Sequence, residues 1–268
     1  MKKITALKAY SRGWEIFKQN ALQHIGIFFL VTIVIMALSA VLMPDTSTMW
    51  LKGFDMSPEN MAMMQQMRPP FLSMLVLLIV EFLAFMFLFG YTLDVVRNQY
   101  KGLGEVFSKY VRGSTFLYMI IFFILFFLAA IAIAVPLVII FSAFQSAGAV
   151  FLGILVTYLL IFYFALRMFF VFYLLLDGYD FADAIRLSWK KTKPYVGEIF
   201  LFVLIPILIY IGFLFLLFLS GNPVIFVAGY IVLLIIGTIA SPYFFISQTV
   251  FYNTAVSDDE STVETPGA

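Results

Sequence analysis

Long runs without charge alternate along the chain with short segments that carry most of its lysine and arginine residues. Residues 113–166 contain no Asp, Glu, Lys or Arg, and neither do residues 199–257. Because a transmembrane helix needs about 20 apolar residues, each of these runs is long enough for two spans. The pattern therefore predicts an all-α membrane protein.

Turn signals divide the apolar runs into six expected spans. Ser, Ala, Gln and Gly gather at residues 142–148, and Ser220-Gly-Asn-Pro223 is a strong turn sequence. We expect transmembrane helices at about residues 22–43, 71–93, 114–140, 149–176, 196–219 and 223–250. Residues 1–257 then form a single six-helix transmembrane domain, and the acidic tail 258–268 is expected to be disordered.

Residues 2–20 have the pattern of a helix that lies in the headgroup layer of a membrane. Apolar residues recur three or four positions apart, and basic residues fall between them. The apolar positions are Ile4, Leu7, Tyr10, Trp14 and Phe17. We therefore expect an amphipathic interfacial helix before the first span.

The basic residues predict how the six spans are oriented. If the N-terminus is cytoplasmic, 14 of the 16 Lys and Arg residues lie inside or near the inner interface, and only Lys52 and Arg68 lie outside. Cytoplasmic segments of membrane proteins are enriched in these residues. The sequence thus predicts an N-in, C-in protein with its interfacial helices on the cytoplasmic side.

The three expected cytoplasmic segments resemble one another, because each has an aromatic residue followed closely by lysine. They are Trp14-Glu-Ile-Phe-Lys18, Glu105-Val-Phe-Ser-Lys109 and Ser188-Trp-Lys-Lys-Thr-Lys193. One interpretation is three related units, each an interfacial helix followed by a hairpin of spans. The other is that the cytoplasmic flank of any span tends to carry aromatic residues and lysine.

Composition narrows the class of protein further. At 63% hydrophobic and 12% charged residues, the chain is far from a soluble domain, which has roughly 45–50% apolar and about 25% charged residues. It has no cysteine and a single histidine, His24, which removes most routes to a zinc site or a histidine-based catalytic triad. We expect no catalytic residue, cofactor, metal site or nucleic-acid partner.

Two segments leave alternatives open. Residues 25–36 and Ala37-Leu-Ser39 have the form of a cleaved signal peptide, but the spans that follow favour a first transmembrane helix. In the outer loop expected at 44–70, clustered thioethers would either bind Cu(I) or Ag(I) or form a flexible apolar face on the bilayer, which we favour. These thioethers are Met61, Met63, Met64 and Met67.

Charged residues inside the apolar spans are the candidate sites, because a charge at mid-bilayer costs at least a few kcal/mol. Counted from the inner ends of their spans, Glu81 lies about 20 Å deep and Arg167 about 15 Å. We expect these two residues to pair, with Glu198 as an alternative partner. The pair would either fix helix register or form a polar site for a proton, an ion or a lipid headgroup.

Three aspartates follow the fourth expected span at intervals of three. Asp177, Asp180 and Asp183 have the spacing of a weak cation site. More simply, Asp180 is expected to cap a helix that begins at Phe181, and Asp183 lies in its first turn, where the helix dipole favours an acid. His24 is expected to make a polar contact at the inner interface.

The segment from Arg167 to Lys193 resembles known bacterial membrane families. Arg167, a mostly apolar stretch, Leu176-Asp177 and then Ala184-Ile-Arg-Leu-Ser-Trp-Lys-Lys-Thr-Lys193 are similar to the YciC-type uncharacterised inner-membrane family. The layout also resembles the membrane domain of bacterial glycerophosphodiester phosphodiesterases. In this chain Val135-Pro136 is followed by Leu137 where those families lead us to expect glycine. The resemblance implies a multi-pass protein of the bacterial inner membrane and carries no activity with it.

Taken together, these patterns predict a non-enzymatic accessory or scaffold protein. Its partners would be membrane lipids and either another membrane protein or a second copy of the chain. The basic side chains expected to engage them are Arg12, Lys18, Arg186, Lys190, Lys191 and Lys193. The alternative is a small transporter or lipid-handling protein that uses the Glu81/Arg167 polar site.

Overall fold

The computed structural model describes residues 4–42, 71–144, 146–219 and 223–257. Within those ranges the chain is helical and contains no strand, which confirms the expected all-α class. The methionine cluster of the loop at 44–70 and the acidic tail at 258–268 lie outside the described residues.

Three short helices each precede a pair of long ones. The first set is α1 (Ala6–Gln19), α2 (Ala21–Leu42) and α5 (Phe71–Val96). The second is α6 (Leu103–Tyr110), α7 (Gly113–Ser142) and α8 (Ala147–Arg167), followed by α9 (Val171–Leu176). The third is α10 (Phe181–Thr192), the 3-10 turn η1 (Lys193–Tyr195), α11 (Val196–Leu219) and α12 (Pro223–Ser257). The segments that resemble one another in sequence lie on α1, α6 and α10.

Local sequence explains where several helices begin and end. The Thr5 hydroxyl accepts from the backbone N–H of Lys8 at 3.3 Å at the start of α1, and Ser146 does the same for Ala149 at 3.1 Å at the start of α8. Both are N-cap bonds that satisfy a helix-end donor. After α5, Asn98 has a φ of 56°, and asparagine tolerates this left-handed conformation better than most residues. The left-handed conformation of Asn98 ends α5 and turns the chain away from the helix axis.

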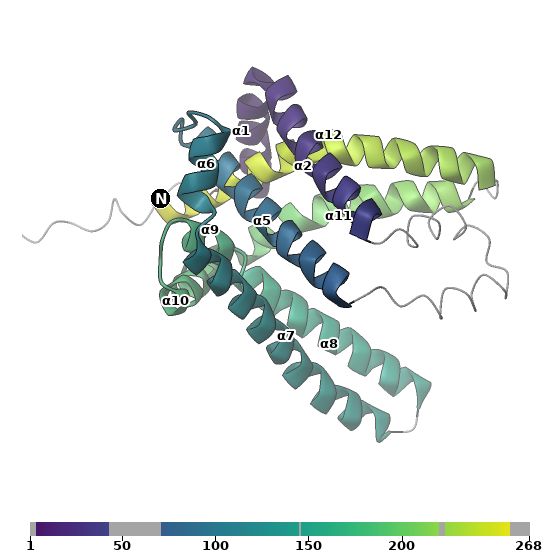
Figure 1. The fold of residues 1–268 in the computed structure, drawn as a ribbon. Coiled ribbons are helices and arrows are strands. Elements are labelled where there is room, and N and C mark those ends of the chain that lie inside the picture. The colour runs from purple at the N-terminus through teal and green to yellow at the C-terminus, as the bar shows by residue number, and fades with distance from the viewer. Residues whose placement is uncertain (1–3, 43–70, 145, 220–222, 258–268) are drawn as a thin grey trace, which may run out of the picture.

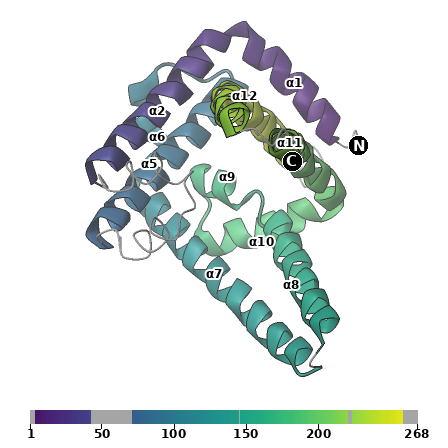
Figure 2. The same cartoon turned by 90° about the vertical axis from the view of Figure 1, so that its right-hand side faces the viewer.

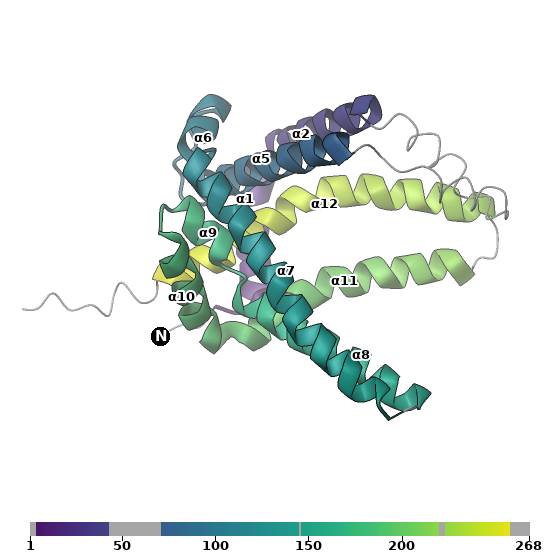
Figure 3. The same cartoon turned by 60° about the horizontal axis from the view of Figure 1, so that its bottom comes forward.

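The three pairs of long helices extend from a common junction and spread apart. Figures 1 and 3 show α2/α5, α7/α8 and α11/α12 running away from the end of the molecule that holds α6, α9 and α10. The α7/α8 pair diverges most. In Figure 2, α1 runs across α12 and α11.

Five helical segments are long and apolar enough to cross a membrane. They are Ala21–Leu42, Phe71–Val96, Gly113–Ser142, Ala147–Leu176 and Phe181–Leu217. Away from the junction, the long helices expose large apolar side chains such as Phe127, Phe151 and Leu216. Exposing this apolar surface to water would be energetically unfavourable, whereas lipid acyl chains can cover it. The fold is that of a multi-pass membrane protein.

The buried core lies at the junction, around the short helix α9. Val171, Tyr173 and Leu174 are fully buried, and the Tyr173 ring stacks on Tyr252 of α12 with centroids 4.7 Å apart. The hydroxyl of Thr249 on α12 donates to Thr92 of α5 at 2.8 Å. Side chains from all three helix sets therefore pack together at this end.

The fourth expected span, 149–176, contains a turn at residues 168–170 between α8 and α9. Hydroxyl groups on α10 take the place of the missing helical hydrogen bonds. Ser188 and Thr192 both donate to the carbonyl of Arg167, at 3.0 and 3.1 Å, and Ser188 accepts from the N–H of Phe170 at 3.3 Å. The turn redirects the chain into the core.

Candidate functional site

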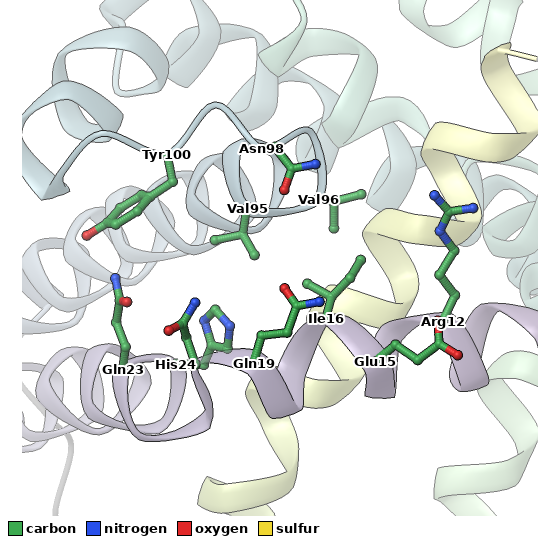
Figure 4. A pocket seen from close by; sticks show the side chains of 11 residues that line it. Arg12, Glu15, Ile16, Gln19, Gln23, His24, Val95, Val96, Asn98 and Tyr100 are labelled. Carbon is green, nitrogen blue, oxygen red and sulfur yellow. The ribbon is translucent and has the colours of Figure 1, made fainter.

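A polar cleft of about 500 Å³ lies between the α1–α2 corner and the end of α5. In Figure 4, side chains of α1 and α2 form one side, residues 95–100 form the other, and Arg12 extends beside α12. The polar lining residues are Arg12, Glu15, Gln19, Asn20, Gln23, His24, Asn98 and Tyr100. Most small-molecule sites are concave and largely apolar with a few converging polar groups. This cleft is concave but lined mainly by polar residues, so it suits a charged or strongly polar ligand.

Helix ends build this cleft. α1 ends at Gln19 and α2 begins at Ala21, so only Asn20 separates the two helices and the chain turns a sharp corner. On the facing side, α5 ends before Asn98 in its left-handed conformation. Backbone groups at helix ends lack helical partners, and three such ends gather around one space.

Arg12 and Glu15 place opposite charges one helical turn apart on α1. Both side chains are exposed, and no ion pair joins them in the described part of the chain. The amides of Gln19 and Gln23 continue the polar lining toward α2. The cleft therefore offers a cation, an anion and neutral hydrogen-bonding groups within one space.

His24 contributes a buried polar atom that has no partner. The residue is 2% exposed, its Nδ1 shares a hydrogen bond with the Tyr91 hydroxyl, and its Nε2 meets the geometry of a hydrogen bond with none of the described residues. A buried polar group without a partner costs about 1–3 kcal/mol. A ligand or water that reaches this nitrogen would remove that cost.

Close packing fixes the position of α1 beside this cleft. Gly13 lies against Ser247 of α12, where an added Cβ would come within 2.8 Å of the Ser247 Cα. The Tyr10 ring stacks on Phe202 of α11 with centroids 4.5 Å apart, and its hydroxyl donates to the Phe202 carbonyl at 2.6 Å. The cleft wall that carries Arg12 and Glu15 is therefore held on α11 and α12.

A second group of charges joins the helices at the junction. The guanidinium of Arg97 donates to both carboxylate oxygens of Asp177, at 2.6 and 2.8 Å. Tyr252 donates to the same carboxylate at 2.6 Å, and Asn253 accepts from Arg97 Nε at 3.0 Å. This group links the ends of α5, α9 and α12.

A neighbouring polar group is centred on Asp94, which accepts hydrogen bonds from two side chains of α6. Asp94 is 1% exposed and accepts from Lys109 Nζ at 2.6 Å and from the Tyr110 hydroxyl at 2.7 Å. Burial raises the pKa of Tyr110 to about 12, so its hydroxyl remains a donor at neutral pH. The sequence predicted neither of these two groups. It shows that the loops are charged, but not which charged residues on different helices come into contact.

The structure does not bring Glu81, Arg167 and Glu198 together. Arg167 is 3% exposed, lies over the Trp189 ring at 4.3 Å and donates to the Trp189 carbonyl. Glu198 accepts from the backbone N–H of Ala6 at 2.8 Å. The depth count was compatible with a Glu81–Arg167 pair, but Arg167 contacts Trp189 on α10, whereas Glu81 lines a pocket with side chains of α7 and α9. The cation–π contact with Trp189 stabilises the buried guanidinium, although its Nε makes no hydrogen bond with the described residues.

Glu81 is exposed on α5 and lines an apolar pocket toward α7 and α9. Within the described residues it has no hydrogen bond or ion pair. The expected Glu81–Arg167 pair is therefore absent among the described residues.

The expected basic surface is only partly exposed. Arg12 lines the cleft, and Lys18, Arg186, Lys190 and Lys193 are exposed. Lys191 is not part of the exposed basic surface, because it is 9% exposed and its Nζ donates to the Val256 carbonyl at 3.0 Å. That carbonyl lies in the last turn of α12, where carbonyl groups lack helical donors.

The three aspartates after α9 have separate environments. Asp177 binds Arg97, and Asp180 occupies the N-cap position of α10 without the expected side-chain bond, since only its carbonyl accepts from Ala184 at 2.8 Å. Asp183 lies in the first turn as expected. No group of three His, Cys, Asp or Glu side chains able to hold a metal occurs among the described residues.

The fold and the cleft define an all-helical, multi-pass membrane protein with a polar cleft beside its first long helix. No protein-family model, curated protein or solved structure matches the chain. The function is therefore inferred from the chemistry of the chain itself.

Proposed function

We propose that the protein is a non-enzymatic membrane protein that binds a zwitterionic phospholipid through its headgroup in the polar cleft. The observation that carries the proposal is the placement of Arg12 and Glu15 in a 500 Å³ cleft where amphipathic α1 meets apolar α2. An amphipathic helix of this kind lies at headgroup depth. The cleft would therefore open where lipid headgroups are.

The lining residues match a phosphate joined to a primary ammonium group. Arg12 is suited to the phosphate, because a guanidinium presents several donors to its oxygens. Glu15 and the amide oxygens accept from an ammonium group, which has three N–H donors. A choline group has no such donor and is usually held by several Phe, Tyr or Trp rings, whereas among the described residues that line the cleft Tyr100 is the one of these three types. We therefore favour phosphatidylethanolamine.

The proposal includes six spans and an N-in, C-in orientation. α12 supplies the sixth span, because its 35 residues contain no charge and reach about 50 Å. The natural absence of cysteine allows single-cysteine labelling in intact cells. Cysteines at Ser11 and Gly104 should react only with permeant maleimide, and a cysteine at Lys52 should react with an impermeant one. The reverse pattern would overturn the orientation.

An accessory role in the bacterial inner membrane follows from this proposal. Exposed Lys18, Arg186, Lys190 and Lys193 would attract anionic headgroups or an acidic partner on the cytoplasmic face, at about 1 kcal/mol for each charge near the surface. The resemblance to the YciC-type family supports the same location. Binding without turnover is sufficient for such a scaffold.

Lipid analysis of the purified protein tests the proposal. The protein would be isolated in mild detergent, and its bound lipids quantified by mass spectrometry against those of the whole membrane. We expect enrichment of phosphatidylethanolamine that Arg12→Gln and Glu15→Gln each abolish. Lys8→Gln, an exposed change on the same helix outside the cleft, should retain it. Equal lipid recovery from all four proteins would contradict the proposal.

A further inference from the structure

A separate apolar pocket of about 470 Å³ lies between α5 and α7, and Glu81 is the charged residue among the described residues that line it. Its volume is within the range of small-molecule sites. The lining includes Glu81, Phe82, Phe85, Phe89, Phe123 and Phe172. None of these residues belongs to the polar cleft.

The phenylalanines form a connected aromatic wall. Phe82 meets Phe123 edge to face, with centroids 4.8 Å apart, and Phe123 lies 5.4 Å from Phe172. Phe89 stacks with Phe172 at 6.2 Å. Five rings from α5, α7 and α9 thus surround one space. Aromatic faces carry partial negative charge and attract cations.

Glu81 is placed where a lone carboxylate is costly. It lies ten residues from the first residue of α5 and fifteen from the last, so about 15 and 22 Å from the two ends of the helix. In the described chain no cationic side chain pairs with it, although it is exposed to the pocket. An acid inside a membrane span is expensive and usually has a functional partner.

We propose that this pocket binds a lipophilic organic cation, such as a quaternary ammonium or phosphonium compound. The cation would pair with the Glu81 carboxylate while its apolar groups contact the phenylalanine rings. A metal ion suits the pocket poorly, because hard cations need several oxygen ligands and the lining offers one carboxylate. An anionic amphiphile would be repelled by Glu81. The site is independent of the headgroup cleft.

Two probes of matched size and opposite charge test the assignment. Tetraphenylphosphonium and tetraphenylborate would be titrated against the full-length protein in nanodiscs, with empty nanodiscs subtracted to isolate saturable binding. We expect saturable binding of the phosphonium, weakened at least tenfold by Glu81→Gln. Binding of the borate should be weaker than that of the phosphonium, and Glu81→Gln should not reduce it.

Two further variants distinguish a specific effect of the Glu81 charge on phosphonium binding from a general effect on charge or folding. Glu105→Gln removes an equal charge from an exposed position outside the pocket and should leave phosphonium binding unchanged. Phe85→Leu keeps an apolar side chain at an exposed position but removes a ring, and should weaken phosphonium binding several-fold. The assignment is overturned if no saturable phosphonium binding occurs, if Glu81→Gln binds it like the wild type, or if both probes lose affinity equally.

Discussion

Arg97 and Asp177 form a bidentate ion pair, with N–O distances of 2.6 and 2.8 Å, that joins the end of α5 to the end of α9. Tyr252 of α12 donates to the same carboxylate. The helices α5, α9 and α12 belong to the first, second and third helix sets, respectively. Because the long helices diverge from this point, the pair ties them together at their shared end.

Breaking this pair should destabilise the junction. The side chains are 25% and 17% exposed, so Arg97→Gln leaves a largely buried carboxylate without its cation, and we expect a loss of about 2 kcal/mol in the free energy of unfolding. Denaturant unfolding in detergent, followed by tryptophan fluorescence, measures this loss. The exposed Lys101–Glu105 pair is the control, and Glu105→Gln should change stability by less than about 0.5 kcal/mol. Equal effects of the two variants would argue against a structural role for Arg97.

The contact of α1 with α12 should be sensitive to one added methyl group. Gly13→Ala places a Cβ against the backbone of Ser247, and overpacking of this kind costs about 1–3 kcal/mol. Gly26→Ala on α2 meets nothing within 4 Å and should be neutral or stabilising by about 0.5 kcal/mol. Limited proteolysis near the N-terminus provides a direct measurement, because only Gly13→Ala should release α1. Identical digestion of the two variants would count against the packed position of α1.

The turn between α8 and α9 depends on Ser188. Ser188→Ala removes the acceptor of the Phe170 N–H and one donor to the Arg167 carbonyl, so we expect a loss of about 1–3 kcal/mol. Ser108→Ala is a matched control, since that exposed hydroxyl donates only to the Glu105 carbonyl within its own helix. Thermal unfolding in detergent compares the two. An unchanged midpoint for Ser188→Ala would show that the hydroxyl does not support the turn.

Alkaline pH should weaken the contact between Tyr110 and Asp94. Burial raises the pKa of Tyr110 from 10.0 to about 12 in the folded protein. Its contribution to stability is therefore fully present below pH 10 and is lost as the pH rises through about 12. Unfolding free energies of wild type and Tyr110→Phe, measured from pH 9 to 12, isolate this contribution. We expect the wild type to lose more stability over that range, and parallel curves would refute the assignment.

The long helices could be predicted from the sequence because membrane spans require uninterrupted apolar runs. Charge-free stretches such as 113–142 leave little choice of structure once a turn signal marks their end. The corner at Asn20 falls between the interfacial helix expected at 2–20 and the span expected from 22, so the sequence predicted its position. The left-handed conformation of Asn98 on the facing side of the cleft produces no such pattern, because it is a single polar residue in a charged loop.

Helix partners were the least predictable feature. Depth along a span suggested that Glu81 and Arg167 could meet, but depth does not determine which faces of two helices touch. Arg167 instead contacts Trp189, only 22 positions away in the chain. The aromatic residue of the α10 segment was visible in the sequence, and a cation–π partner for the arginine was the signal that could have identified the contact.

Headgroup selectivity in defined lipid is the most direct test of the proposed function. Native mass spectrometry of the full-length protein would give the ratio of dissociation constants for phosphatidylcholine and phosphatidylethanolamine with matched acyl chains. We predict a ratio of at least ten for the wild type and for Glu105→Gln, falling to about one in Glu15→Gln, because a tenfold preference corresponds to about 1.4 kcal/mol, the size of one charge-assisted hydrogen bond. A ratio near one for the wild type, or a preference that Glu15→Gln preserves, would contradict headgroup recognition in the cleft.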